Sequence, residues 1–296
     1  MIRGLYTATS GMIALQRKQE SISNNIANMN TAGYKQADTE FRSFPKMMVE
    51  LARDSEFKYN ATKPILGVFS TGVLAEENVM RFNQGDLQET NNPFDFALVD
   101  RMEVDGATIG ENGITRDSQG TIVHRPKAFF TVMDSSGQIR YTRASKFMFN
   151  DSGELVTPEG DRLMGTDGQP IVVADQSKIN VTKNGQILQS ETGYPILNAG
   201  NQPIAGFLIS KIANPDKLIP IGNNKFRFDG DPTTVPGVEM SDSVEIHQGF
   251  IERSNVDGTK AMVDMITVSR AYEANQKMIQ TIDKNMEKTV NDVGRV

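Results

Sequence analysis

The sequence contains no cysteine and no tryptophan, and it has two histidines among 296 residues. The lack of cysteine excludes disulfides, thiolate metal sites and thiol nucleophiles. His124 and His247 each lack a second ligand residue at the spacing of a zinc site. We expect both to be ordinary surface or strand residues, and we predict no metal, no cofactor and no catalytic residue.

Basic stripes and long apolar runs are missing as well. The net charge is −6, which argues against a nucleic-acid partner, because binding phosphates needs clustered Lys and Arg. No apolar run is long enough for a membrane span, and the first 30 residues hold no continuous apolar block of a cleavable secretory signal. No phosphate loop or nucleophile elbow occurs, so we predict no small-molecule substrate. If the protein is exported, its route must be a different one.

Both ends of the chain carry apolar residues that alternate at steps of three and four. At the N-terminus only Gln19 is polar among Met1, Leu5, Ala8, Met12, Leu15, Gln19, Ile22, Ile26 and Met29. At the C-terminus Asn275 and Thr289 interrupt Ala261, Met265, Val268, Tyr272, Asn275, Ile279, Ile282, Met286, Thr289, Val293 and Val296. So narrow an apolar stripe is typical of a coiled-coil seam.

Each of these helices would be roughly 45–50 Å long and would need a partner helix, from the same chain or a neighbouring one. This favours assembly over catalysis. The predicted self-assembly seam consists of Leu5, Met12, Leu15, Ile22, Ile26, Met265, Tyr272, Ile279, Ile282 and Met286. Lys18 lies off the stripe, and we expect it to be exposed.

A cluster of polar residues follows the first helix. Gly33 suits a left-handed residue past a helix end, and asparagines and glycine are usual in such turns. Four asparagines in seven residues exceed what a cap requires. The residues concerned are Asn24, Asn25, Asn28, Asn30, Gly33 and Tyr34.

The rest of the chain is read as β-structure, except for an ambiguous stretch at 36–75. There Phe41, Phe44, Met47, Met48 and Leu51 give a short helical period, and residues 53–64 are polar like a loop. From about residue 73, Gly turns recur between short β-branched and aromatic runs, which indicates an antiparallel barrel or sandwich. The runs are 128–132, 139–142, 147–149, 178–182, 204–212 and 226–228.

We therefore predict an α+β fold in which the terminal helices pair as a coiled-coil-like stem and an antiparallel β-rich domain is inserted between them. The predicted segments are an N-terminal core helix, an extended linker, a β-rich middle domain and a C-terminal core helix. Their predicted ranges are 1–35, 36–75, 76–250 and 251–296.

Several strings of the sequence, in this order, match one family. They are 4–8, 23–28 and 30–35 near the N-terminus; 84–95 before the middle domain; 141–143, 147, 153–157 and 160 within it; and 248–257 and 270–275 near the C-terminus. In them the sequence resembles the axial proteins of the bacterial flagellum, the rod and hook subunits, and most of all the distal rod proteins. Departures lie in the middle domain, where residues 101–125 form an extra segment and Ala144-Ser145 replaces the family's Asp-Gly.

The resemblance implies a structural subunit of the flagellar basal body. Such subunits leave unfolded through the flagellar type III export apparatus and assemble with themselves and with other rod and hook subunits into a hollow, torque-transmitting tube. In such a tube the asparagines at 24, 25, 28 and 30 would form hydrogen bonds at a junction between subunits, and capping alone is the alternative. Two alternatives stay open: a hook or hook-junction subunit, and a secreted adhesin or enzyme with a β domain on a coiled-coil stem. A long, well-ordered bridge at 36–75 would favour a stiff rod.

Overall fold

The structure, a computed structural model, describes residues 2–44, 47–50, 65–70, 72–102, 114–116, 122–173, 179–189, 206–231, 235–237 and 243–293. The chain divides into two units, each interrupted in sequence. The first unit joins Met1–Ala27, Ala37–Val79 and Asp257–Val296, and the second joins Asn28–Gln36 and Met80–Val256. The second unit is called the middle domain below.

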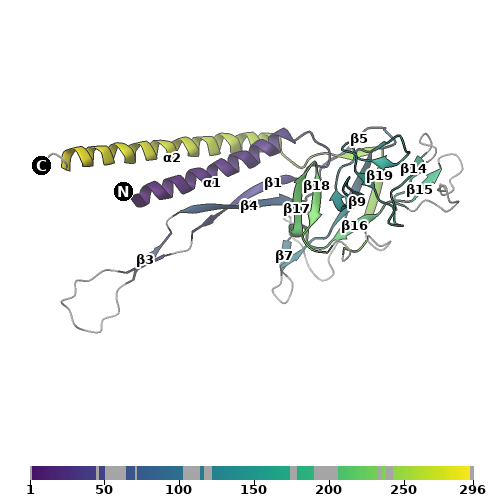
Figure 1. Cartoon of the computed structure of the whole chain (residues 1–296), viewed down its shortest axis with the longest axis horizontal. Helices are drawn as coiled ribbons and strands as arrows, with labels where there is room; N and C mark the ends of the chain where they lie inside the picture. The colour runs from purple at the N-terminus through teal and green to yellow at the C-terminus, as the bar shows by residue number, and fades with distance from the viewer. Residues whose placement is uncertain are drawn as a thin grey trace. The chain divides into compact units, whose positions relative to one another are not determined.

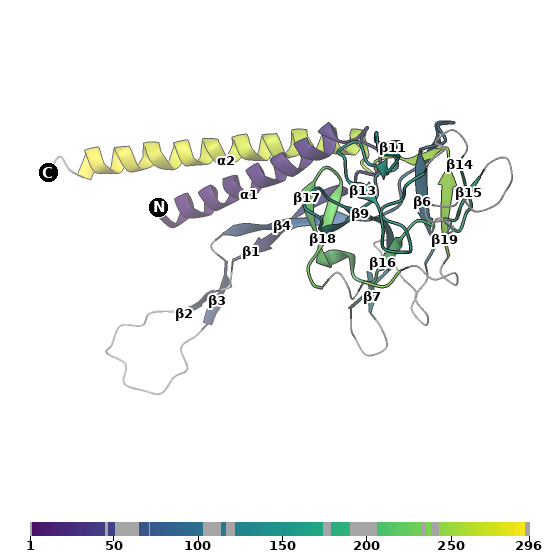
Figure 2. The ribbon, with the colours of Figure 1, turned by 45° about the vertical axis from the view of Figure 1, so that its right-hand side comes forward.

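The first unit contains the predicted pair of helices, α1 (Ile2–Ala27) and α2 (Gly258–Val293), together called the stem. Figures 1 and 2 show them side by side and antiparallel. Asp257 caps α2 by accepting hydrogen bonds from the backbone N–H groups of Thr259 and Lys260, which satisfies donors that a helix start leaves free. Within the described residues no helix is long and apolar enough to cross a membrane.

The same unit contains a two-part β-ribbon. Strand β1 (Gln36–Ser43) pairs with β4 (Val73–Arg81), and β2 (Met47–Glu50) pairs antiparallel with β3 (Ile65–Phe69). The helical period suggested for 41–51 is therefore wrong where the structure describes it. The signal that decides is the alternation at the start of β1, where every second residue, Ala37 and Thr39, is buried. Leu51 and the loop predicted at 53–64 lie outside the described residues.

The middle domain is built from short strands, and every strand pairing recorded in it is antiparallel. Its eight-stranded sheet has the order β11-β12-β13-β9-β10-β18-β17, with β16 paired to β9. These strands are β9 (Lys127–Met133), β10 (Ile139–Thr142), β11 (Met148–Phe149), β12 (Leu155–Val156), β13 (Arg162–Leu163), β16 (Ile209–Ile212), β17 (Leu218–Gly222) and β18 (Lys225–Phe228).

Smaller two-stranded pairings complete the domain. They are β5 (Leu87–Glu89) with β20 (Phe250–Glu252), β6 (Phe96–Asp100) with β19 (Val244–Gln248), β7 (Ile114–Arg116) with β8 (Ile122–His124), and β14 (Ile179–Val181) with β15 (Ile187–Gln189). A short 3-10 helix, η1 (Pro215–Lys217), precedes β17. The β-rich, antiparallel prediction is thus confirmed, and the β9–β10 hairpin turns at Ser136-Gly137.

Aromatic side chains fill the core of the middle domain. Phe96, Phe130, Phe147 and Phe207 meet edge-on or tilted, with ring centroids 5.0–6.0 Å apart. A second cluster on the sheet centres on Phe82, Phe129 and Phe226. Such large buried rings contribute much of the hydrophobic stabilisation of a domain, so the middle domain has a core of its own.

Candidate assembly site: the stem and the chain junction

The predicted seam of α1 faces α2. Ile22 is buried, and Leu5, Met12, Leu15 and Ile26 are half-buried. Small residues allow the helices to approach closely: a Cβ on Gly4 would lie 3.6 Å from Ile282, and one on Gly11 would lie 3.3 Å from Asn275.

The seam of α2 shows the same pattern. Ala261 and Val268 are buried, whereas the longer seam side chains are half-buried: Met265, Tyr272, Ile279, Ile282 and Met286. Residues between them are mostly exposed. The pairing of the two terminal helices is thereby confirmed, and it takes place within one chain. That these residues also serve self-assembly stays a prediction.

Lys18 differs from the expectation of an exposed residue. Its ammonium pairs with Asp38 and donates a hydrogen bond to the carbonyl oxygen of Thr39 at 3.1 Å, and its side chain is only partly accessible. Lys18 therefore fastens α1 to β1. The reason is geometric: a residue off the α2-facing stripe of α1 still lies against the ribbon.

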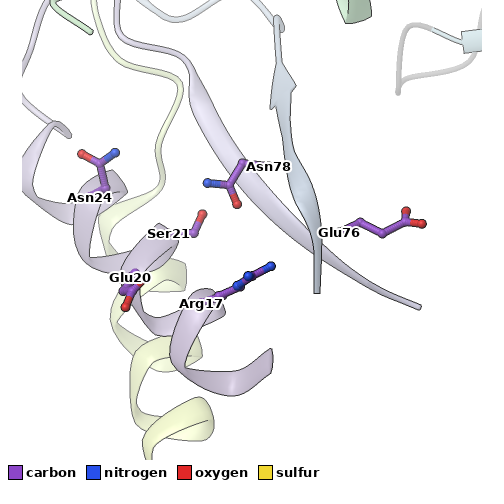
Figure 3. A pocket seen from close by; sticks show the side chains of 6 residues that line it. All are labelled: Arg17, Glu20, Ser21, Asn24, Glu76 and Asn78. Carbon is purple, nitrogen blue, oxygen red and sulfur yellow. The ribbon is translucent and has the colours of Figure 1, made fainter. Parts of the chain in front are cut away.

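A polar groove of ≈ 350 Å³ lies between α1 and β4, lined by Arg17, Glu20, Ser21, Asn24, Glu76 and Asn78. Figure 3 shows Arg17 and Asn78 pointing into the space between the two elements, whereas Glu76 points away from α1. Arg17 donates to the carbonyl oxygen of Ala75 at 3.3 Å, and Glu76 accepts from Arg42 at 2.8 Å. The first contact fastens the helix to the ribbon and the second joins β1 to β4 within the ribbon, and neither brings a catalytic pair together.

Asn25 ties α1 to β1. Its side-chain amide donates to the carbonyl oxygen of Ala37 at 2.7 Å and its side-chain oxygen accepts from the N–H of Ala37 at 3.0 Å. The Ser21 hydroxyl donates to the same carbonyl at 3.0 Å. Both side chains are buried, so their polar atoms are used within the chain. Bridging to β1 accounts for Asn25 without a second subunit.

The other members of the asparagine cluster are spread over two units. Helix α1 ends at Ala27, earlier than the predicted end near residue 30, and Asn28 begins a turn in which its carbonyl oxygen accepts from the N–H of Thr31 at 3.1 Å. Asn24 and Asn30 are exposed. Tyr34 is buried, and burial raises the pKa of its hydroxyl. A role of these residues at a subunit junction stays a prediction.

At Gly33, residues 28–36 contact the last strand of the middle domain, β20. The φ of Gly33 is +73°, a region that L side chains rarely adopt, and its N–H donates to the carbonyl oxygen of Glu252 at 2.7 Å. A Cβ at this position would lie 2.1 Å from the carbonyl oxygen of Arg143. The left-handed conformation predicted for Gly33 is confirmed, but it lies six residues beyond the helix end and serves a close backbone approach.

Beside Gly33, five charged side chains form a buried network within the middle domain. Lys35 donates a hydrogen bond to Oε1 of Glu252 at 2.6 Å, and the Arg143 guanidinium forms an ion pair with Oε2 of Glu252 at 3.2 Å. Arg143 also pairs with Asp100 at 2.9 Å, and Lys127 pairs with Asp100 at 3.0 Å. Three cations thus surround two carboxylates, and all five residues are buried. Removing one partner of such a network leaves a buried charge uncompensated.

Burial and charge act in opposite directions on these groups. Burial raises the pKa of Asp100 and of Glu252, but the neighbouring cations, Arg143 first, outweigh it and hold both pKa values below their usual range. Burial, together with the Arg143 guanidinium, lowers the pKa of Lys35 to about 8 even though Glu252 opposes the shift. Both carboxylates are therefore ionised at neutral pH.

No pattern in the sequence predicts this network. Its members come from five distant segments, and the pattern of a single segment cannot show that charges meet in space. One signal was present, because Lys35, Arg143 and Glu252 each lie in a different family-like string. Among the described residues, no three His, Cys, Asp or Glu side chains are placed to hold a metal ion.

Three known protein families match the chain, one near each end and one in the middle domain. Residues 5–35 match the family "Flagella basal body rod protein", residues 126–189 match "Flagellar hook protein FlgE/F/G D1 domain", and residues 247–292 match "Flagellar basal body rod FlgEFG protein C-terminal". The hook-basal body complex protein FlhO of Bacillus subtilis is 34% identical over 100% of both chains. The chain belongs to the flagellar axial protein family.

Rod proteins of this family are similar over nearly the whole length. The basal-body rod protein FlgG of Borreliella burgdorferi is 30% identical over 100% of both chains, and that of Agrobacterium fabrum is 32% identical over 96% of both. The chain is thus a structural subunit of the flagellar rod and is located in the flagellar basal body. The hook alternative is not favoured.

Proposed function

We propose that this subunit polymerises through its stem into the hollow distal rod and transmits torque along it. The observation that carries the proposal is the stem itself. Two long helices pair through a narrow seam, while large apolar side chains stay exposed on their outer faces. The stem therefore offers surface to further helices. Its partners are further copies of this chain and other rod and hook subunits.

The contacts of the ribbon support the proposal that this chain is a rod subunit. Segment 36–75 contains paired strands, and hydrogen bonds from Ser21 and Asn25 fasten its first strand to α1. A bridge so fastened resists bending, which suits a shaft. The exposed Asn24 and Asn30 are the members of the asparagine cluster that we propose for contacts between subunits.

We also propose export by the flagellar type III apparatus and a purely structural role. The absence of a continuous apolar block in residues 1–30 supports a route without signal cleavage. The strongest constellation of charges is sealed from solvent, with Arg143 and Glu252 each about 1–2% exposed, so no substrate can reach it. Its chemistry is that of a structural ion network.

The seam can be tested with two neighbouring substitutions on α2. Ile279 is half-buried in the seam, and Lys277 is exposed. Ile279→Asp places a carboxylate against apolar neighbours, so we expect loss of swimming and loss of the subunit from purified basal bodies. Lys277→Asp should leave both nearly unchanged, since surface substitutions usually stay within about 0.5 kcal/mol. Normal swimming and normal incorporation with Ile279→Asp would contradict assembly through the stem.

A further inference from the structure

The backbone passes between the first unit and the middle domain four times, after Ala27, Gln36, Val79 and Val256. Each of these passages is called a connection below. A single chain turns about its φ and ψ angles unless further bonds hold it. A subunit that transmits torque has to carry twist through its connections, so side chains that join one connection to another are candidates for a mechanical role.

One side chain, that of Asn255, is bonded beside three of the four connections. Its Oδ1 accepts a hydrogen bond from the backbone N–H of Gln36 at 2.7 Å. Its Nδ2 donates to the carbonyl oxygen of Arg81 at 2.7 Å and to that of Asn83 at 3.2 Å. Asn255 itself lies directly before the last connection, and all four residues belong to the middle domain. The three connections are therefore joined within one folded unit.

Gln36 and Arg81 form the base of the ribbon. Gln36 is the first residue of β1, Arg81 is the last residue of β4, and these two strands pair. Strand pairing thus joins the second connection to the third, but it does not include the segment that leads to α2. The side chain of Asn255 bonds that segment to the base of the ribbon.

Neighbouring bonds keep the segment before Asn255 in place. The N–H of Arg253 donates to the carbonyl oxygen of Asp86 at 2.8 Å, and the N–H of Gly85 donates to Oε1 of Glu252 at 3.0 Å. A Cβ on Gly85 would lie 2.0 Å from the carbonyl oxygen of Arg253, so only glycine allows this approach of the two backbones. Asn255 lies beyond these contacts, next to the connection itself.

The chemistry of an asparagine fits this position. Its amide has one carbonyl oxygen that accepts and one amino group with two donors, and here the oxygen meets an N–H group while the amino group meets two carbonyls. Aspartate has nearly the same shape but no donor, and leucine has neither donor nor acceptor. Substitutions of Asn255 can therefore separate its hydrogen bonds from its volume.

We propose that Asn255 is a clasp that joins three of the four connections, so that twist entering through one of them is shared by all three. The proposal rests on the proposed function, because a shared load matters in a subunit that transmits torque. Without the clasp, the segment before α2 turns about its own backbone independently of the ribbon. Loss of Asn255 should thus loosen this segment while the core of the middle domain stays folded.

A second amide in the middle domain provides a matched control. Gln248 also makes three bonds to backbone groups: it accepts from the N–H of Val181 at 2.8 Å and donates to the carbonyl oxygens of Pro93 at 2.7 Å and Ile179 at 3.1 Å. None of these partners lies beside a connection. Gln248→Leu therefore removes the same kinds of bond as Asn255→Leu but leaves the clasp intact.

Limited trypsin digestion of the purified full-length chain tests the clasp without a rod. Arg253 is exposed, and cleavage after it requires local opening of the segment that Asn255 holds. Loss of two or three hydrogen bonds corresponds to at least about tenfold more opening, so Asn255→Leu should speed this cleavage about tenfold or more. Gln248→Leu should leave the rate unchanged. A parental rate with Asn255→Leu, or the same acceleration with Gln248→Leu, would overturn the proposal.

Asn255→Asp guards against a leucine variant that fails to fold. The carboxylate still accepts from the N–H of Gln36 but donates nothing to Arg81 or Asn83. It should therefore speed cleavage after Arg253 as Asn255→Leu does. If Asn255→Asp is cleaved at the parental rate, the bonds to the base of the ribbon do not hold the segment, and the proposal fails.

Swimming in media of rising viscosity tests the role of the clasp in torque. Cells that carry Asn255→Leu in place of the native chain should swim nearly like the parent in dilute buffer and lose speed as viscosity rises, because a higher load puts more twist on the connections. Cells with Gln248→Leu should follow the parent. Equal speeds of both variants at every viscosity would contradict load sharing. If the unmodified chain is itself missing from purified basal bodies, the proposed function fails instead.

Discussion

The stem and the middle domain place their side chains in opposite ways. The middle domain buries large residues, among them Phe96, Phe129, Phe130 and Tyr141, and it encloses charged groups such as Arg143 and Glu252 that form ion pairs with each other. The stem buries mostly small or polar residues and leaves large apolar ones at the surface. Those buried include Ala8, Ala14, Ser21, Asn25 and Ala261, and those exposed include Tyr6, Ile13, Met262 and Ile266.

This difference separates two tasks within one chain. A domain that satisfies its own apolar and polar groups can fold without neighbours. A stem that leaves apolar surface uncovered gains from each further helix that covers it, because burying apolar area is the main favourable term in association. Four substitutions, at Arg143, Gly33, Lys35 and Glu252, test how far the stability of the middle domain depends on its buried charges and on one close backbone contact.

The largest effect is expected from Arg143→Met. The substitution keeps an apolar side chain over the Phe129 ring but removes the cation between Asp100 and Glu252. Breaking a buried ion network by removing one partner costs about 3–5 kcal/mol. Urea unfolding of the middle domain, followed by its tyrosine fluorescence, would measure the loss.

The matched control is Lys183→Met, which breaks an exposed pair with Glu245 in the same domain. Exposed pairs contribute about 0–1 kcal/mol, so this variant should unfold almost like the parent. Equal losses for Arg143→Met and Lys183→Met would show that the network adds nothing to the domain.

A smaller effect is expected from Gly33→Ala, compared with Gly137→Ala. Both glycines have φ near +75°, so both substitutions carry the left-handed penalty of about 1–2 kcal/mol. Gly137 has open space where a Cβ would lie, whereas at Gly33 that atom would collide with the backbone of Arg143. Gly33→Ala should therefore lower the melting temperature clearly further. Identical melting temperatures would mean that residues 28–36 do not need this close approach.

The smallest effect is a dependence of stability on alkaline pH. The pKa of Lys35 is about 8 in the folded chain and near 10.5 as its ordinary value, so between these values the unfolded chain binds more protons. Stability then rises with pH across this window. The parent should melt at a relatively higher temperature near pH 10 than Lys35→Met, which lacks the titrating group. Parallel curves for the two proteins would contradict the lowered pKa.

Acid should act in the other direction. The lowered pKa values of Asp100 and Glu252 give stability that is present above their unfolded values and is lost as pH falls through the folded ones. A Glu252→Gln chain should therefore lose less stability on acidification than the parent does.

The elements at both ends of the chain could be predicted from sequence because their apolar repeat is long and regular. Several strands of the middle domain were also predictable, and β10 begins and ends where the pattern placed it, at Ile139 and Thr142. The ribbon was misjudged because Phe41 and Phe44 are three residues apart, as on a helix. Both rings are exposed, so they carry no information about a buried face.

The candidate site was only half predictable for a related reason. A seam along one helix repeats in sequence, so Met265, Tyr272 and Ile279 could be identified together. Whether such a seam meets its own chain or a neighbour is not written in the repeat, and here it meets α1. The boundaries predicted at 35, 75 and 250 stay predictions, although helix α2 itself begins at Gly258.

The hydrogen bond between Gly33 and Glu252 joins the first and last segments of the middle domain, and this has a mechanical consequence. Tension that enters the domain from α1 and leaves it toward α2 meets a direct tie, the 2.7 Å backbone hydrogen bond with the Lys35–Glu252 ion pair beside it. Such a pull shears this tie before it reaches the strands further along the chain. The hydrogen bond and the ion pair therefore bear the load first, and the aromatic sheet bears less of it.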